Sequence, residues 1–319
     1  MAQAPVVDSV AIERESIAGE DEFGVAGDVT RALHITTRDF VVRREVLIKP
    51  GQPYDSALAY ETERNLRALG AFRRVLLDTL RTADGRLVFR VRTQDGWTTY
   101  PLFDISSAAG QTSFTLGLEE GNFLGLAAQA EARYRSTPDR TSWLLTYRQP
   151  RAIANRVGVS AAWEERSDGR YLFGNVSQPF LTFSSTTAYG VDATNFDGDV
   201  LRFREGDPSP YVTLRRRLFL GRASFARALS ASPRGYTRVG VQAQVRREDF
   251  LEQPVGDTPF SETWTGAVGP YVEWARARFV VVRNVRSFLR EEDEPVGPSF
   301  RLGLLLAPEA FGYERNGAG

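Results

Sequence analysis

The sequence has no cysteine and holds one histidine, His34, and one methionine among its 319 residues. Without thiols the chain can form neither a disulfide framework nor a thiolate metal site, and a single imidazole excludes catalysis that needs a second one. His34 is expected to be an ordinary strand or turn residue. We therefore expect no cofactor, no metal site and no enzymatic activity.

The sequence also lacks an excess of charge of either sign and long apolar runs. The 40 basic residues balance 40 acidic ones, so no net field favours nucleic acid, and nucleic-acid binding is disfavoured. The run Leu302 to Ala307 is far shorter than the roughly 20 apolar residues of a helical membrane span. Met1 to Asp8 lacks the features of a signal peptide, which favours a mature chain whose leader has been removed over a cytosolic one.

What the sequence does have is strict two-residue alternation. From Ala127 to Arg135, small residues and a tyrosine alternate with polar and charged ones, as they do on a strand with two different faces. The segments Thr141 to Arg148, Val157 to Glu164 and Arg238 to Arg246 repeat this pattern, and turn clusters separate them. The alternation predicts the wall of a transmembrane β-barrel, with one face toward lipid and the other toward water.

Aromatic residues near the strand ends are expected to form the interfacial girdles of such a barrel, although aromatic residues are also common in any strand. The residues concerned are Tyr134, Trp143, Tyr147, Trp163, Tyr171, Trp264, Tyr271 and Trp274.

Residues 1–96 mix helical and strand periods and predict a small α/β domain in the order strand, helix, helix, strand, strand. A strand is expected to start at Ser9, and a first helix over Thr37 to Ile48 with Phe40, Val41 and Leu47 inward. A second helix begins after the N-cap Asp55 and ends at Gly70, with Leu58, Thr62, Leu66 and Leu69 on one face. Strands over Phe72 to Leu80 and Arg86 to Arg92 follow, joined by a turn at Ala83-Asp84-Gly85.

Adjacent carboxylates such as Glu119/Glu120 point to opposite faces of a strand, so such a pair cannot act together on one bond or ion.

The stretch from Arg43 to Val75 resembles a polypeptide-transport-associated (POTRA) domain. It contains the break Pro50-Gly51-Gln52-Pro53-Tyr54-Asp55 between two helices, and then the step Leu69-Gly70-Ala71-Phe72 into an edge strand. Downstream, Glu119-Glu120-Gly121-Asn122-Phe123-Leu124-Gly125 is similar to the turn after the first barrel strand in the bacterial surface-antigen, BamA-like superfamily.

Two features depart from that family. The arginine-glycine-aromatic motif of a late loop is matched by Arg234-Gly235-Tyr236, which falls too early to be an equivalent. Residues 97–319 supply only about 11 strands, at about 20 residues per strand and loop, whereas the resemblance implies sixteen. The fold expected is thus a POTRA-like α+β domain (residues 1–96) followed by an antiparallel, incomplete transmembrane β-barrel (residues 97–319), in a C-terminally truncated chain.

The resemblance implies an outer-membrane protein assembly or insertion factor, with the first domain in the periplasm. It would act by β-strand augmentation, so its sites are the backbones of edge strands. Its partners would be unfolded outer-membrane client proteins, accessory assembly proteins and outer-membrane lipid. The expected binding residues are Arg73, Val75, Leu77 and Thr79 in the first domain and Ser113, Thr115 and Gly117 in the first barrel strand.

Three alternatives remain open at this point. A two-partner secretion transporter belongs to the same class, and no residue decides between exporter and inserter. A passive outer-membrane channel would need the wall but not the first domain. A soluble all-β binding protein with an α/β appendage would bury both faces of its strands under protein.

Overall fold

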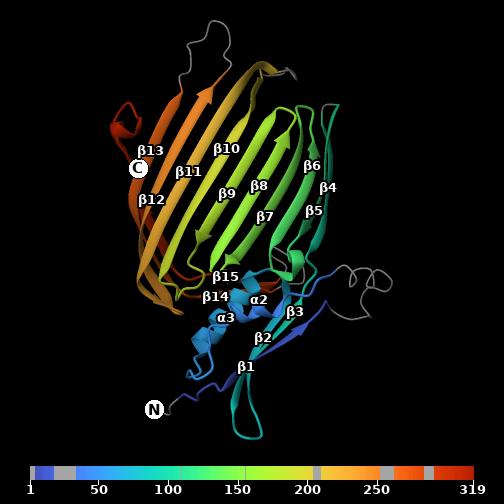
Figure 1. The fold of residues 1–319 in the computed structure, drawn as a ribbon, viewed down its shortest axis with the longest axis vertical. Helices are drawn as coiled ribbons and strands as arrows, with labels where there is room; N and C mark the ends of the chain where they lie inside the picture. The colour runs from blue at the N-terminus through green and yellow to red at the C-terminus, as the bar shows by residue number, and fades with distance from the viewer. Residues whose placement is uncertain are drawn as a thin grey trace.

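The computed structural model describes residues 4–17, 34–108, 110–154, 156–203, 210–251, 262–283 and 291–319. A small α/β domain lies below one end of a large curved antiparallel sheet (Figure 1). The small domain ends with a strand at Asp95, and the large sheet begins with a strand at Thr99.

The small domain has the element order predicted from the sequence. Its elements are β1 (Ser9–Glu15), α2 (Asp39–Arg43), α3 (Ser56–Ala68), β2 (Phe72–Arg81) and β3 (Leu87–Asp95). The strands form a sheet in the order β1-β3-β2, in which β1 runs parallel to β3 and β2 runs antiparallel to it. The predicted strand, helix, helix, strand, strand arrangement is therefore confirmed.

The helix α3 begins and ends where the sequence predicts. The Asp55 carboxylate accepts a hydrogen bond from the Ala57 amide at 2.7 Å, which satisfies one of the free amides of the first turn. After the last turn, Gly70 adopts a φ of 70°, a left-handed conformation that glycine adopts without a steric penalty. Thr62 and Leu66 are fully buried on the face that packs against the sheet.

The first helix differs from the prediction. α2 covers only Asp39–Arg43, about one turn, and the chain from Arg44 to the break at Lys49 is not helical. Val41 and Val42 are both fully buried, whereas Phe40 is 45% exposed, so the expected inward position of Phe40 was wrong. A helix this short buries two neighbouring residues rather than a stripe at three- and four-residue spacing.

The core of the small domain lies between the helices and β3. Alternate β3 residues Leu87, Phe89 and Val91 point into it, and Phe89 and Val91 are fully buried. Leu66, Val75 and Ile48 pack against them. Ala127, from the large sheet's first turn at this end, belongs to the same cluster, so the two parts of the chain share a core.

The large sheet has thirteen strands among the described residues, and β4 to β13 each pair with their neighbour in sequence. These strands are β4 (Thr99–Ala108), β5 (Gln111–Glu120), β6 (Gln129–Ser136), β7 (Thr141–Ile153), β8 (Val157–Arg166), β9 (Gly169–Gln178), β10 (Thr187–Phe203), β11 (Pro210–Ser232), β12 (Gly235–Phe250) and β13 (Thr263–Arg276). Three short strands complete it: β16 (Ser299–Gly303), β17 (Leu306–Ala307) and β18 (Gly317–Ala318). A separate hairpin, β14 (Phe279–Arg283) with β15 (Glu291–Pro295), lies at the end near the small domain.

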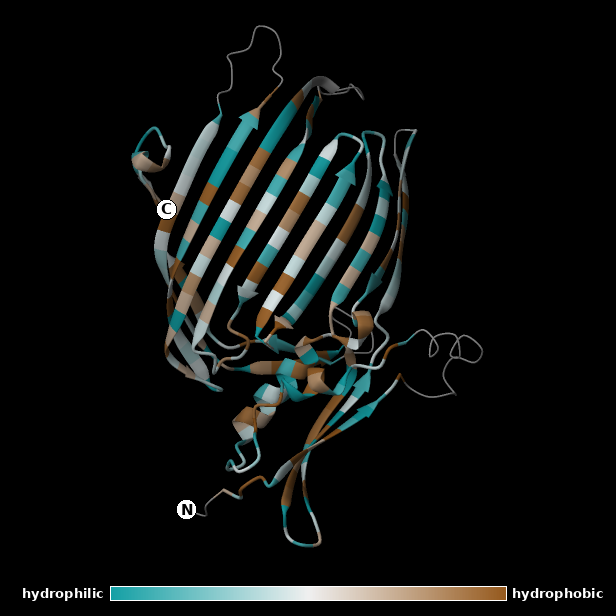
Figure 2. Ribbon diagram, viewed as in Figure 1, coloured by the Kyte–Doolittle hydropathy of each residue, from teal (hydrophilic) through white to brown (hydrophobic). Residues whose placement is uncertain are grey.

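The strand register keeps the two faces of the sheet distinct. Residues directly opposite each other in paired strands share a face. One row that crosses five strands contains only small or apolar side chains: Ala161, Gly174, Ala193, Gly221 and Val245. The adjacent row on the other face is entirely polar: Ser160, Asn175, Asp192, Arg222 and Gln244. The predicted alternation is confirmed, and Figure 2 shows it as alternating brown and teal bands along the strands.

The polar face is the concave one. It lines a cavity of about 460 Å³ with Asn175, Asp192, Arg222 and Gln242. The opposite face presents large apolar side chains that no other part of the described chain covers, including Trp143 (56% exposed) and Val191 (57%). A layer of protein over this face, which a soluble sandwich would need, is absent from the described residues.

Two of the predicted girdle aromatics face the concave side. Tyr171 pairs with Glu164 and shares its polar face, and Tyr271 lines the concave cavity, so both predictions were wrong. The Tyr271 ring lies flat against Gly240, where a Cβ would come within 2.4 Å of the ring. The other six lie on the apolar face, as predicted: Tyr134, Trp143, Tyr147, Trp163, Trp264 and Trp274.

The large sheet is open. In the described part of the chain β4 pairs only with β5, and no pair joins it to β16, β17 or β18. Among the same residues, no helix combines the length and hydropathy needed to cross a bilayer.

The N-cap of α3 gives a first test of these local interactions. Asp55→Ala removes the acceptor for the Ala57 amide and should cost about 1 kcal/mol, or about fivefold faster hydrogen exchange in residues 56–60. Asp55→Asn keeps a side-chain oxygen and should exchange like the wild type. Equal exchange in all three proteins, measured by mass spectrometry, would show that the cap contributes nothing.

Candidate functional site

The predicted binding strand of the small domain is an edge of its sheet. In the described residues β2 pairs only with β3. Val75 points into the core and is 1% exposed, Leu77 is half-buried and Thr79 is exposed. Arg73 lies at a register shift between Phe72 and Arg74, so the strand starts with a bulge. The backbone from Val75 to Thr79 is thus placed to pair with a further strand, and whether it does so stays a prediction.

The predicted binding strand of the large sheet is not an edge. Ser113, Thr115 and Gly117 lie on β5, which pairs with β4 on one side and β6 on the other. Their backbone groups are therefore already in ladders, and their assignment to an edge was wrong. The turn at Gly121-Asn122 follows the second strand of the sheet rather than the first.

In the described residues the edge strand next to β5 is β4, which the sequence analysis did not identify, and the opposite end of the sheet is formed by β16, β17 and β18. Its residues alternate like those of the other strands: Phe103 and Ile105 are 72% and 61% exposed on the apolar face. Pro101 also suits an edge, since proline lacks one ladder donor. The sequence did contain a signal for a strand before β5. Gly110, which has a φ of 76°, marks the tight turn between β4 and β5.

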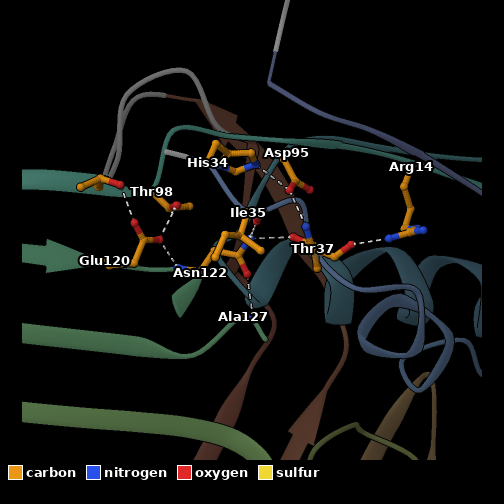
Figure 3. A network of polar contacts seen from close by, with 10 residues as sticks. Arg14, His34, Ile35, Thr37, Asp95, Thr98, Glu120, Asn122 and Ala127 are labelled. Carbon is orange, nitrogen blue, oxygen red and sulfur yellow. Dashed lines mark hydrogen bonds and ion pairs between the residues drawn. The ribbon is translucent and has the colours of Figure 1, made fainter. Parts of the chain in front are cut away.

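The small domain is held against the end of the large sheet at four places. The first is Asn122, which is 3% exposed (Figure 3). Its Oδ1 accepts from the Ala127 amide at 2.8 Å, and its Nδ2 donates to the Ile35 carbonyl at 3.1 Å and the Thr37 hydroxyl at 3.0 Å. One amide side chain therefore closes the β5–β6 turn and ties it to the segment before α2.

A carboxylate on each side extends this network. The Glu120 carboxylate accepts hydrogen bonds from the Thr98 hydroxyl and from the backbone N–H of Asn122, both at 2.6 Å. Asp95, at the end of β3, accepts from the Thr37 amide at 2.7 Å and contacts His34 Nε2 at 2.9 Å. His34 is therefore part of a buried polar network that links three segments, which the sequence did not indicate.

The second place is a buried charge cluster that directly follows α2 in the chain. Arg151, from the end of β7, forms an ion pair with Glu45, and Arg44 Nε lies 3.5 Å from the same carboxylate. Burial raises the pKa of Glu45, and the two arginines oppose this effect. A charge cluster this buried is costly to disrupt, because removing one partner leaves the others desolvated and unpaired.

The third place is the β9–β10 turn, which contacts α3 through Glu61. Glu61 accepts from the Phe183 amide at 2.5 Å and from the Ser184 hydroxyl at 2.7 Å. On the other side of this turn, Arg238 donates to the Thr182 carbonyl at 2.8 Å and lies over the rings of Phe180 and Tyr236 at 3.7 and 3.6 Å. α3 is thereby connected through the turn to the concave wall.

The fourth place joins α3 to the β14–β15 hairpin. Arg67 lies within ion-pair distance of Glu63 (2.5 Å), Glu291 (3.3 Å) and Asp293 (3.2 Å). Burial raises the pKa of Glu63, and Arg67 opposes this effect.

These contacts position backbone edges rather than reactive groups. No cluster of three or more metal-ligating side chains occurs among the described residues. The chemistry that the geometry offers is main-chain hydrogen bonding at β2 and β4.

Comparisons with known proteins add two distant similarities. No family model and no curated protein matches the sequence. BamA from Haemophilus ducreyi lacking POTRA domains 1–3 is similar over 94% of this chain and 48% of its own, at 13% identity and a TM-score of 0.37. CdiB from Acinetobacter baumannii is similar over 96% of this chain and 61% of its own, at 9% identity and a TM-score of 0.42. The chain thus spans about half of the first structure and three fifths of the second.

Asn122 should contribute strongly to docking of the small domain. Asn122→Ala leaves the buried Ala127 amide without its acceptor and should lower the free energy of unfolding by about 3 kcal/mol. Asn122→Asp keeps that acceptor but buries a carboxylate against the Ile35 carbonyl, so it should destabilise at least as much as the alanine variant. Urea unfolding followed by tryptophan fluorescence measures the difference, and an alanine variant as stable as the wild type would contradict it.

The stability of the edge strand β2 should depend on pH through Asp78. A hydrogen bond from Arg90, at 2.8 Å, lowers the pKa of Asp78, so its stabilising effect is present at neutral pH and is lost as the pH falls. Asp78→Asn should cost about 0.5–1 kcal/mol at pH 7, and this difference should shrink as acid protonates the Asp78 carboxylate. Asp84→Asn, on the exposed β2–β3 turn, is the control with a smaller effect. A difference between wild type and Asp78→Asn that does not change with pH would refute the role of the carboxylate.

Proposed function

We propose that the protein is an outer-membrane protein assembly and insertion factor of the BamA-like superfamily. The observation that carries this proposal is the combination of a two-faced antiparallel wall with a free edge at β4, next to a βααββ domain docked under its end. The POTRA-like motifs of residues 43–75 and the distant similarities to BamA and CdiB agree with it. The small domain is the POTRA domain of this proposal, and it faces the periplasm.

The membrane location is supported by the faces and lengths of the strands. An outer-membrane barrel strand needs about 9–11 residues to cross the hydrocarbon layer. β8 and β9 have ten residues each, with apolar residues on the convex face and polar residues on the concave one. In this arrangement the row through Gly174 and Ala193 contacts lipid, and the row through Asn175 and Asp192 contacts water.

The proposed mechanism is backbone pairing. An unfolded client strand adds to the free edge of β4, which satisfies main-chain groups that lipid would leave unpaired. β2 offers a second edge, in the periplasm, to clients or accessory proteins. The activity needs no catalytic side chain and no cofactor.

The four docking contacts support a joint role for the two edges. They fix the small domain against the turns of β5–β6, β7, β9–β10 and the β14–β15 hairpin. A client held on β2 would therefore be kept near the periplasmic end of the wall.

Photo-cross-linking of the full chain in liposomes tests the proposal. A urea-denatured eight-stranded outer-membrane barrel protein serves as the client, and p-benzoyl-phenylalanine replaces one residue at a time. Phe103 on β4 and Thr79 on β2 should cross-link to the client, because both edges accept a strand. Leu145, which is 46% exposed on the apolar face of the interior strand β7, is the matched control and should not.

The outcomes separate the proposed function from its alternatives. Cross-links at Phe103, together with a protease-protected client in the bilayer, support the insertion factor. Cross-links only from concave-face positions such as Asn175, with client inside the liposomes, would indicate a secretion transporter instead. No cross-link at any position would favour a passive channel and would overturn the proposal.

A further inference from the structure

A cavity of about 530 Å³ lies between α3, the β11–β12 turn and β14, and one side of it is formed by the Arg67 ion pairs described above. Three parts of the chain that are distant in sequence line it. Its main contributors are Tyr60 and Arg64 from α3, Pro233 and Arg234 from the turn, and Phe279 and Val281 from β14.

The carboxylates at this cavity are already paired. Glu63 and Asp293 both contribute to its lining, and both form ion pairs with Arg67, at 2.5 and 3.2 Å. Arg67 is thus shared among three carboxylates, because Glu291 also contacts it. The cavity lining as a whole carries three arginines against two carboxylates, which leaves an excess of one positive charge.

Two other arginines of the cavity have no such partner. In the described part of the chain, neither Arg64 nor Arg234 forms an ion pair or a side-chain hydrogen bond with a carboxylate. The Arg64 guanidinium lies 4.5 Å above the Phe279 ring. A guanidinium that lies over an aromatic ring keeps N–H groups with which it can bind a phosphate.

The environment of Arg64 also disfavours an isolated charge. Burial lowers the pKa of Arg64, because its guanidinium is partly desolvated, and the charges of Glu61, Asp293 and Glu63 offset this effect only in part. A bound anion would compensate for that lost solvation.

The remainder of the lining is apolar or amphipathic and accessible. Val281 is 51% exposed and Tyr60 is 64% exposed, and Pro233 and Ala277 lie in the same lining. A ligand that fills the cavity would therefore contact two cationic groups at one part and hydrocarbon surface at another.

We propose that this cavity binds a phosphate-bearing amphiphile, with its phosphate between Arg64 and Arg234 and its apolar chain along Phe279 and Val281. This site goes beyond the proposed function and does not depend on it, because neither β2 nor β4 contributes to the cavity.

Isothermal titration of the full chain in dodecyl maltoside micelles tests the site. The ligands are dihexanoyl phosphatidic acid, zwitterionic dihexanoyl phosphatidylcholine and inorganic phosphate, each corrected by titration into empty micelles. The wild type should bind the phosphatidic acid more tightly than either other ligand, because only that ligand offers both an unmasked anion and an apolar chain.

The variants assign the binding to this cavity. The double variant Arg64→Gln/Arg234→Gln should weaken binding by about tenfold or more, since two charge-assisted contacts are lost. Arg86→Gln, on the exposed β2–β3 turn, should leave it unchanged. If the double variant fails to fold, as judged by circular dichroism, Tyr60→Glu replaces it: this position on α3 is 64% exposed, and a carboxylate four residues before Arg64 should neutralise that arginine and repel the ligand.

Three results would overturn the proposal. One is a wild type that does not bind phosphatidic acid. Another is equal binding of inorganic phosphate or phosphatidylcholine, which would show that the cavity does not require both a free phosphate and an apolar chain. The third is unchanged binding in the folded variant, either the double-glutamine protein or Tyr60→Glu, which would place the ligand elsewhere.

Discussion

Antiparallel pairing transmits the orientation of a side chain from one strand to the next, and the architecture of the large sheet depends on this constraint. Because Ala161 faces outward, register places Gly174, Ala193 and Gly221 outward as well. A slip of one residue in any hairpin would bring Asn175 or Asp192 onto the apolar face. Among the described residues the same pairing leaves β4 as one open edge of the sheet, with β16 and β18 at the other.

The local rules of helix and strand formation allowed most of the fold to be predicted. Asp55 and Gly70 fix the ends of α3 by their own hydrogen-bonding and backbone preferences, so they could be recognised without tertiary information. The two-residue period likewise gave the faces of β6, β7, β8 and β12. Tyr171 and Tyr271 were misplaced because they were grouped by residue type and strand-end position rather than by the face that their strand parity assigns.

The candidate site could be predicted only in part, because edges and docking contacts are properties of the assembled chain. β2 was recognised as an edge from the POTRA-like step at Leu69-Gly70-Ala71-Phe72. β5 was taken for the first strand because the turn at Asn122 was interpreted without the hairpin before it. Nothing near His34 in the sequence indicates Asp95, which lies 61 residues further on. Glu45 and Arg151 are likewise 106 residues apart.

The docking of Arg67 on Asp293 has a consequence for the order of events during synthesis, because 226 residues separate the two. The small domain leaves the ribosome early, with its helices and sheet able to form from local contacts. Its contact with the β14–β15 hairpin must wait until almost the entire wall has been translated. The surface of α3 that carries Glu63 and Arg67 therefore stays exposed until the hairpin has been made, and its burial is a late step of folding.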